Sequence, residues 1–137
     1  MFFAVYGVSI LAEMEIDVDA FDPQKDEDCV ELAAALVAYA LGLKTDEILS
    51  PGRGRQAIVQ ARQITIYLSC TGLGMSLSRV SRALLRDRST ASHACQVIED
   101  RREDADFDVW CEQLEVGLAS VLGLRKVAAS DDATEAA

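Results

Sequence analysis

Apolar residues recur every three or four positions along most of this chain of 137 residues, and that period is typical of amphipathic α-helices. The pattern predicts helices at residues 28–41, 57–70, 76–84, 89–102 and 107–124, with a single helical turn at 45–49. Aromatic residues make up only 6% of the chain, which argues against a β-sandwich or barrel. The sequence therefore predicts an all-α fold of about five to six helices.

The chain is long enough for one domain, which we place at residues 28–126. We expect residues 1–27 to form an acidic N-terminal arm, extended or disordered, because they lack a helical period. Residues 127–137 are small and acidic, and we expect a disordered tail there. The apolar run at residues 2–12 is about half as long as a bilayer crossing requires, so we expect no membrane association.

The cysteines and the histidine form no metal-site or catalytic pattern. Cys29, Cys70, Cys95 and Cys111 lie far apart in the sequence, and His93 is the single histidine. His93 and Cys95 are two positions apart on a predicted helix, so they point to different faces and form no catalytic dyad. We therefore expect reduced thiols, no metal, no cofactor and no enzymatic activity.

Charge is strongly segregated along the chain. The net charge of −10 would, as an average, disfavour nucleic acid. Residues 51–102, however, hold nine arginines against three acidic residues and carry +6, whereas the rest of the chain carries −16. Arginine has a planar guanidinium group that matches phosphate and base edges, so this segment is typical of a local nucleic-acid footprint. A solvated helical face is the alternative explanation for the same charges.

Two of the predicted helices, at residues 76–84 and 89–102, are short and joined by a tight turn. The second helix opens with the small hydroxylated residues Ser89, Thr90 and Ser92. Helices arranged in this way form a helix-turn-helix, in which the N-terminal side chains of the second helix reach base edges in the major groove. Generic helix pairs have the same spacing, so the pattern alone leaves DNA binding open.

The residues of this region resemble a known family. The strings Ala61-Arg-Gln-Ile-Thr-Ile-Tyr-Leu68, Ser76-Leu-Ser-Arg-Val-Ser-Arg-Ala-Leu84 and Arg86-Asp-Arg-Ser-Thr-Ala-Ser-His-Ala-Cys95 are similar to the C-terminal DNA-binding domain of the bacterial replication initiator DnaA. The similarity covers residues 28 to about 120. It implies a Trp-repressor-like helix-turn-helix bundle.

The resemblance also implies a role for individual residues. It assigns base readout in the major groove to the start of the second helix, at Asp87, Arg88, Ser89, Thr90 and His93. It assigns a minor-groove contact to a basic loop, through Arg53 or, failing that, Arg55, and a phosphate contact to Arg62. We also expect Arg79, on the first helix of the pair, to contact phosphate. A half-buried packing role is the alternative for His93. Arginine suits a narrow, electronegative minor groove, and threonine offers both a methyl group and a hydroxyl to a base.

This sequence departs from the family pattern at three positions. Arg88 stands where the family has histidine, Arg79 stands where the family has an acidic residue, and Cys70 replaces a common lysine. We therefore expect an altered DNA sequence preference. The chain has no phosphate-binding loop with a Gly-Lys-Ser/Thr ending, so we expect no nucleotide binding.

These observations predict sequence-specific binding of double-stranded DNA at a DnaA-box-like site. The implied role is regulation of replication initiation or transcription, in the cytoplasm and in association with the nucleoid. The alternative is a protein-interaction adaptor that keeps the fold but has lost DNA binding. Its acidic N-terminal arm would then dock a protein partner.

Overall fold

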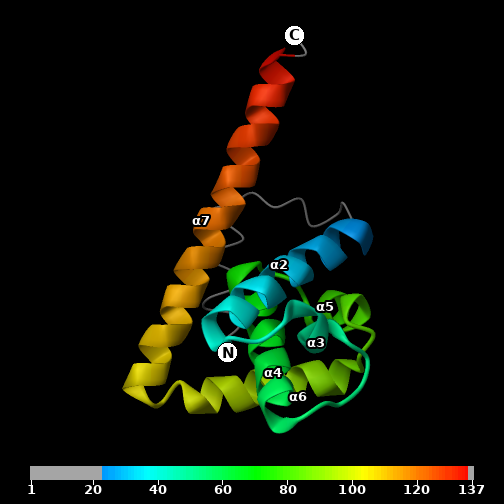
Figure 1. The fold of residues 1–137 in the computed structure, drawn as a ribbon, viewed down its shortest axis with the longest axis vertical. Coiled ribbons are helices and arrows are strands. Elements are labelled where there is room, and N and C mark those ends of the chain that lie inside the picture. Colours follow the sequence, from blue (N-terminus) through cyan, green and yellow to red (C-terminus); the bar gives the residue numbers. More distant parts are fainter. Residues whose placement is uncertain (1–22, 136–137) are drawn as a thin grey trace.

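The computed structural model describes residues 23–135, with side chains described from Gln24 to Leu124. This part of the chain is helical without strands, which confirms the predicted all-α class. The helices are α2 (Pro23–Leu41), α3 (Thr45–Leu49), α4 (Gln56–Gly72), α5 (Leu77–Ala83), α6 (Arg88–Arg101) and α7 (Ala105–Glu135) (Figure 1). None of these helices is long and apolar enough to cross a membrane.

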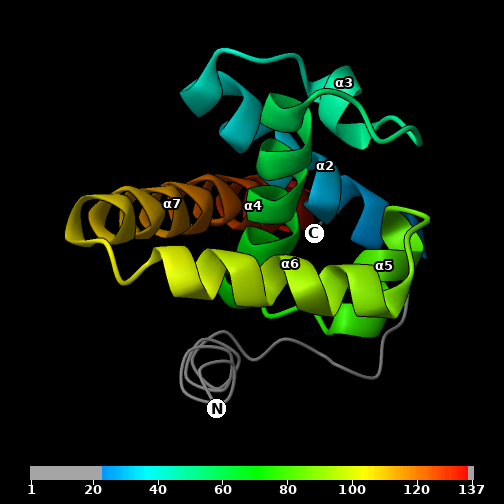
Figure 2. The same cartoon turned by 90° about the horizontal axis from the view of Figure 1, so that it is seen from below.

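Helix α4 is the centre of the fold, and α2, α6 and α7 pack around it (Figures 1 and 2). From Ile64 to Gly72 every residue of α4 is buried, as expected for a helix enclosed on all sides. Three hydroxyl groups in this stretch are buried as well. Thr65, Ser69 and Thr71 each donate to the carbonyl four residues earlier, at 2.9, 2.8 and 3.1 Å, so these groups are satisfied inside the core.

Helix α2 begins earlier than its apolar period predicts. It starts at Pro23, a residue suited to the first helical position, and not at residue 28. The predicted start of this helix is therefore too late by five residues, and the helix already includes Asp26, which is buried. The rest of the predicted arm, residues 1–22, lies outside the described residues. At its other end α2 stops before Gly42, which has a φ of +69° as predicted for a C-terminal glycine.

Helix α7 is longer than predicted at its C-terminal end. It runs along one side of the body and extends beyond it (Figure 1). The sequence predicts a disordered tail from residue 127, whereas the helix continues to Glu135. Residues 125–135 contain no glycine or proline and include three alanines, a composition compatible with a continuing helix.

Helices α5 and α6 form the predicted helix-turn-helix and pack against each other. Figure 2 shows α6 crossing in front of α4, with α5 beside its N-terminal end. Ser76 caps α5 by accepting a hydrogen bond from the backbone N–H of Arg79 at 3.2 Å. In the turn, Leu85 has a φ of 55° and is 86% exposed, so an apolar, left-handed residue lies on the surface between the two helices.

Candidate nucleic-acid interface

The first turns of α6 place the predicted base-reading residues together on the surface. Arg88, Ser89, Thr90 and His93 are all exposed, while Ala91 on the opposite face is buried. Position 93 is four residues from 89 and three from 90, so its side chain lies next to both of theirs on the surface of the helix. His93 is therefore a surface residue, not the half-buried packing residue that we considered as an alternative.

Asp87 immediately precedes α6 and occupies its N-cap position. Its side chain is exposed and makes no capping hydrogen bond to the helix. A carboxylate at this end still interacts favourably with the helix dipole. Within the described part of the chain the group is thus left open to an outside partner.

The loop between α3 and α4, residues 50–55, is the predicted basic loop. Arg53 and Arg55 are both exposed, but their surroundings differ. Arg55 pairs with Glu47 at 3.3 Å, whereas the side chain of Arg53 has no such partner among the described residues. Gly54 separates them with a φ of +76°, and a Cβ there would lie 3.2 Å from Ile58. Because Arg55 is paired with Glu47, Arg53 is the candidate whose guanidinium group has no ion-pair partner among the described residues.

Arg62 has a different setting from the one that its predicted phosphate contact requires. It lies in α4 and is only 6% exposed. It donates to four backbone carbonyls, those of Ile48 at 2.8 Å, Arg53 at 3.1 Å, Ser50 at 3.1 Å and Glu47 at 3.3 Å. Burial, and next the positive charge of Arg86, lower the pKa of the Arg62 guanidinium from its ordinary value. The geometry therefore supports a structural role for Arg62, and we leave it out of the DNA contacts.

Arg79, the other residue predicted to contact phosphate, is also engaged within the fold. Its guanidinium group binds both carboxylate oxygens of Asp26, with Nε 3.1 Å from Oδ2 and Nη2 2.5 Å from Oδ1. The hydrogen bond to Asp26 is the main reason that the pKa of Arg79 is raised. This bidentate pair connects α5 to the start of α2, and Asp26 is 3% exposed.

Sequence reasoning missed Arg86, which precedes the recognition helix. Its side chain crosses to the basic loop and donates from Nη2 to the carbonyls of Ser50 at 2.9 Å and Gly52 at 3.1 Å. The residue belongs to the string that resembles DnaA, but nothing local in the sequence indicates a partner more than thirty positions away. The structure therefore connects two regions that the sequence treats separately.

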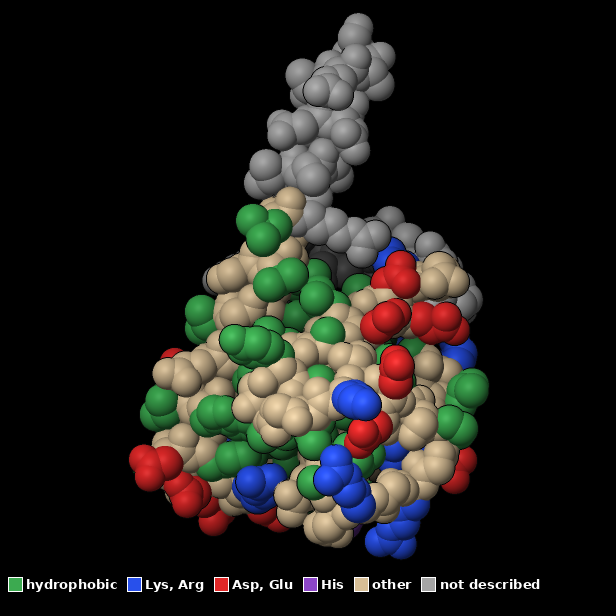
Figure 3. Space-filling model, viewed as in Figure 1, with side chains coloured by type: hydrophobic (Ala, Val, Ile, Leu, Met, Phe, Trp, Pro, Cys, Tyr) green, Lys and Arg blue, Asp and Glu red, His purple; other side chains and the backbone are tan. Residues whose placement is uncertain are grey.

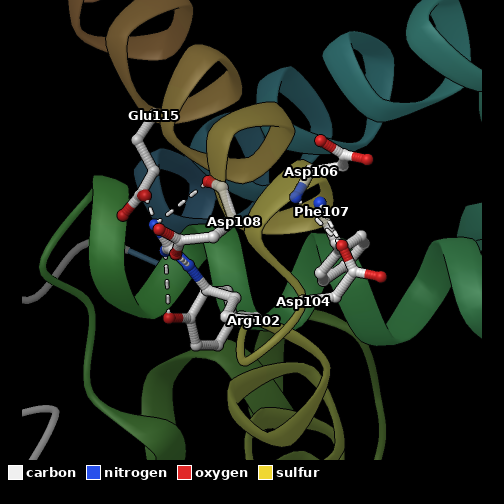
Figure 4. Close-up of polar contacts among 7 residues, drawn as sticks. Arg102, Asp104, Asp106, Phe107, Asp108 and Glu115 are labelled. Carbon is white, nitrogen blue, oxygen red and sulfur yellow. Dashed lines mark hydrogen bonds and ion pairs between the residues drawn. The ribbon is translucent and has the colours of Figure 1, made fainter.

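The opposite end of α6 is fixed to α7 by a second arginine that the sequence analysis did not single out. Arg102 binds Asp108 at 2.5 Å and Glu115 at 2.7 Å, and donates to the hydroxyl of Tyr67 at 3.2 Å (Figure 4). Burial alone would lower the pKa of Arg102, but these hydrogen bonds raise it above its ordinary value. Asp104 accepts hydrogen bonds from two backbone N–H groups in the first turn of α7 (Figure 4). The C-terminal end of α6 is thus fixed by the side-chain hydrogen bonds of Arg102.

Charged side chains are unevenly distributed over the face that Figure 3 shows, and on its right side some basic side chains lie beside acidic ones. Figure 3 shows acidic side chains over α2 at the upper right and in the lower left corner, with several basic side chains at the lower edge. The lower edge is the side on which α6 lies in the same view (Figure 1). Among the described residues no cluster of His, Cys, Asp or Glu has an arrangement that could hold a metal ion.

A short helix pair with an exposed, arginine-containing start to its second helix defines the class of helix-turn-helix DNA-binding domains. The family model for the bacterial DnaA protein helix-turn-helix matches residues 30–98, half of the chain. The chain therefore belongs to this family, which confirms the resemblance found in the sequence. Family membership implies a DNA-binding module in the context of replication initiation.

Solved structures agree with this assignment. A crystal structure of a DNA replication initiation factor is 28% identical and has a TM-score of 0.63, with 71% of this chain and 30% of the other covered. A structure of the replication initiator DnaA bound to AMPPCP and single-stranded DNA is 24% identical, has a TM-score of 0.61 and covers 82% of this chain and 32% of the other. The chain thus spans about a third of the length of these proteins. A comparison with curated proteins gives no significant match.

Proposed function

We propose that this chain binds double-stranded DNA sequence-specifically, at a site similar to a DnaA box. In this proposal α6 enters the major groove and presents Asp87, Arg88, Ser89, Thr90 and His93 to base edges. The loop at residues 50–55 follows the adjacent minor groove, into which Arg53 inserts. The biological role would be regulation of replication initiation or transcription.

The observation that carries the proposal is the contrast among the arginines. Three arginines donate hydrogen bonds to groups of the protein itself: Arg62, Arg79 and Arg86. Arg53 and Arg88 have exposed guanidinium groups without a protein partner among the described residues, and each belongs to one of the two elements expected to enter a groove. Free arginines at those two places support a DNA-reading surface over a merely solvated face.

The experiment is a fluorescence-anisotropy titration of two labelled duplexes, one with a DnaA-box-like site and one with the same bases scrambled, at several salt concentrations. We expect tighter binding to the box and a slope of log K against log salt of about −4 to −6, corresponding to about five phosphate contacts. Equal binding to both duplexes would contradict recognition of a DnaA-box-like site. Absence of binding at low salt would overturn the proposal and favour the protein-interaction adaptor.

Two substitutions on α6 make the test specific. Arg88→Ala and Thr90→Ala should each weaken binding to the box by about 1–3 kcal/mol and reduce discrimination against the scrambled duplex, if each contacts a base edge. Arg101→Ala is the matched control, because it removes the same charge from an exposed position on the same helix. It lies 13 residues from Arg88, about 20 Å along the helix, and should leave discrimination unchanged.

A further inference from the structure

The carbonyls of Ser50, Gly52 and Arg53 in the basic loop accept hydrogen bonds from arginine side chains. Arg62, from α4, and Arg86, from the turn before α6, both donate to the carbonyl of Ser50, at 3.1 and 2.9 Å. Arg62 also binds the carbonyl of Arg53, and Arg86 that of Gly52. Three carbonyls of a loop without regular structure are therefore fixed by two guanidinium groups.

Arg86 is tied to the helix-turn-helix at the same time. Its backbone N–H donates to the carbonyl of Ser81 in α5 at 2.8 Å, which fixes the turn. Two residues later comes Arg88, the first residue of α6. A single residue thus connects the loop that carries Arg53 with the end of the helix that carries Arg88.

The connection is also electrostatically unusual. The guanidinium groups of Arg62 and Arg86 lie close enough that the charge of Arg86 lowers the pKa of Arg62. The hydrogen-bond acceptors that these two side chains use are neutral backbone carbonyls. Two like charges side by side are unfavourable. The fold tolerates that repulsion at this place, where the contacts hold the loop in one position.

We propose that Arg86 is a positioning residue that sets the distance and orientation between the basic loop and the N-terminal end of α6, so that Arg53 and Arg88 reach adjacent grooves together. The inference rests on the DNA-binding function proposed above. Preorganisation of this kind matters because ordering a flexible loop during binding costs free energy that a preformed loop does not lose. Arg86 itself needs no base contact for this role.

The first measurement concerns the free protein. Arg86→Met removes the donors and keeps an unbranched apolar stem. We expect the ¹⁵N backbone order parameters of residues 52–55 to fall below about 0.6, while those of the buried part of α4, residues 64–70, stay near about 0.85. Arg86→Lys, which keeps charge and donors, should restore part of the order. Arg101→Met is the matched control and should leave the loop unchanged.

The second measurement is a double-mutant cycle for binding to the box duplex. Arg53→Ala should weaken binding by about 5- to 150-fold in the parent, but by less than about threefold in the Arg86→Met background, because the loop is no longer held in place. If Arg53→Ala instead costs the same affinity in both backgrounds, the two residues are not coupled and the proposal is overturned.

The two measurements separate this inference from the function on which it rests. If the parent binds no DNA, the proposed function fails, while the NMR relaxation measurement still shows whether Arg86 holds the loop. If the parent binds the box but the cycle shows no coupling, the function stands and the positioning role fails. Should Arg86→Met not fold, Arg86→Lys is carried through both measurements, with weaker coupling and intermediate order parameters expected.

Discussion

At the scale of single residues, the contacts of each arginine determine what it does. Charge counting along the sequence treats the nine arginines of residues 51–102 alike. In the structure Arg62, Arg79 and Arg102 are committed to carbonyls and carboxylates inside the fold. A basic segment therefore combines exposed arginines with arginines that bind groups inside the fold, and only the tertiary contacts distinguish the two.

The Arg102 cluster gives a prediction about stability at this scale. The side chain of Glu115 is 15% exposed and that of Asp108 is 47% exposed, although both bind the same guanidinium group. Glu115→Gln should therefore lower the free energy of unfolding by about 1–2 kcal/mol, because it leaves a mostly buried charge less well compensated. Asp108→Asn, the matched control in a more exposed position, should cost less than about 1 kcal/mol.

Urea unfolding followed by far-UV circular dichroism measures both variants. Equal losses for Glu115→Gln and Asp108→Asn would contradict the idea that burial determines the value of each pair. Stability of both variants at the level of the parent would show that the cluster adds nothing to the fold.

At the scale of elements, local sequence patterns identify most helices and fail where distant contacts decide. The helices at α4, α5 and α6 begin and end within one or two residues of their predicted bounds, since apolar period and glycines mark them. The start of α2 was missed because residues 23–27 show no apolar period. Asp26 is buried there through its pair with Arg79, 53 positions away.

The candidate site shows the same contrast between features set by local sequence and features set by distant contacts. That the proposed base-reading residues lie together on one exposed surface could be predicted, because they are consecutive or one turn apart on a single helix. The roles of Arg62 and Arg86 could not, because their acceptors lie 9 to 36 positions away and are backbone carbonyls, which any sequence offers. Resemblance to a family indicates which positions correspond to one another. It does not indicate which groups each side chain contacts in this chain.

The two helices of the helix-turn-helix also differ at their N-terminal ends, which gives a second prediction. Ser76 caps α5 with its side chain, whereas Asp87 makes no side-chain bond to α6. Ser76→Ala should lower the free energy of unfolding by about 1 kcal/mol. Asp87→Asn should cost less than about 0.5 kcal/mol, a small helix-dipole effect, while it changes DNA sequence preference. Thermal unfolding and the anisotropy titration report the two properties separately. A larger stability loss for Asp87→Asn than for Ser76→Ala would contradict this division.

At the scale of the whole molecule, an acidic protein can bind DNA when its charges are arranged in space. The exposed carboxylates of Glu103 and Asp106 lie at the C-terminal end of α6 and the start of α7. The reading end of α6, at Arg88, is 15 residues from Glu103. This is about 20 Å at the rise of an α-helix. Repulsion between this acidic corner and DNA at the other end of α6 is therefore a long-range effect.

This separation predicts a salt-dependent result for the variant with both Glu103→Gln and Asp106→Asn. Two unit charges 20 Å apart interact by about 0.2 kcal/mol in water, so removing both acids should tighten binding by about twofold at 10 mM salt. At 150 mM salt the Debye length is about 8 Å, and the gain should vanish. Anisotropy titrations at both salt concentrations measure this gain in affinity. Arg53→Ala is the control, and it should lose affinity at both salt concentrations. An equal gain at 10 and 150 mM would place the acidic corner against the DNA, and α6 would then lie in the groove along its whole length instead of by its N-terminal end.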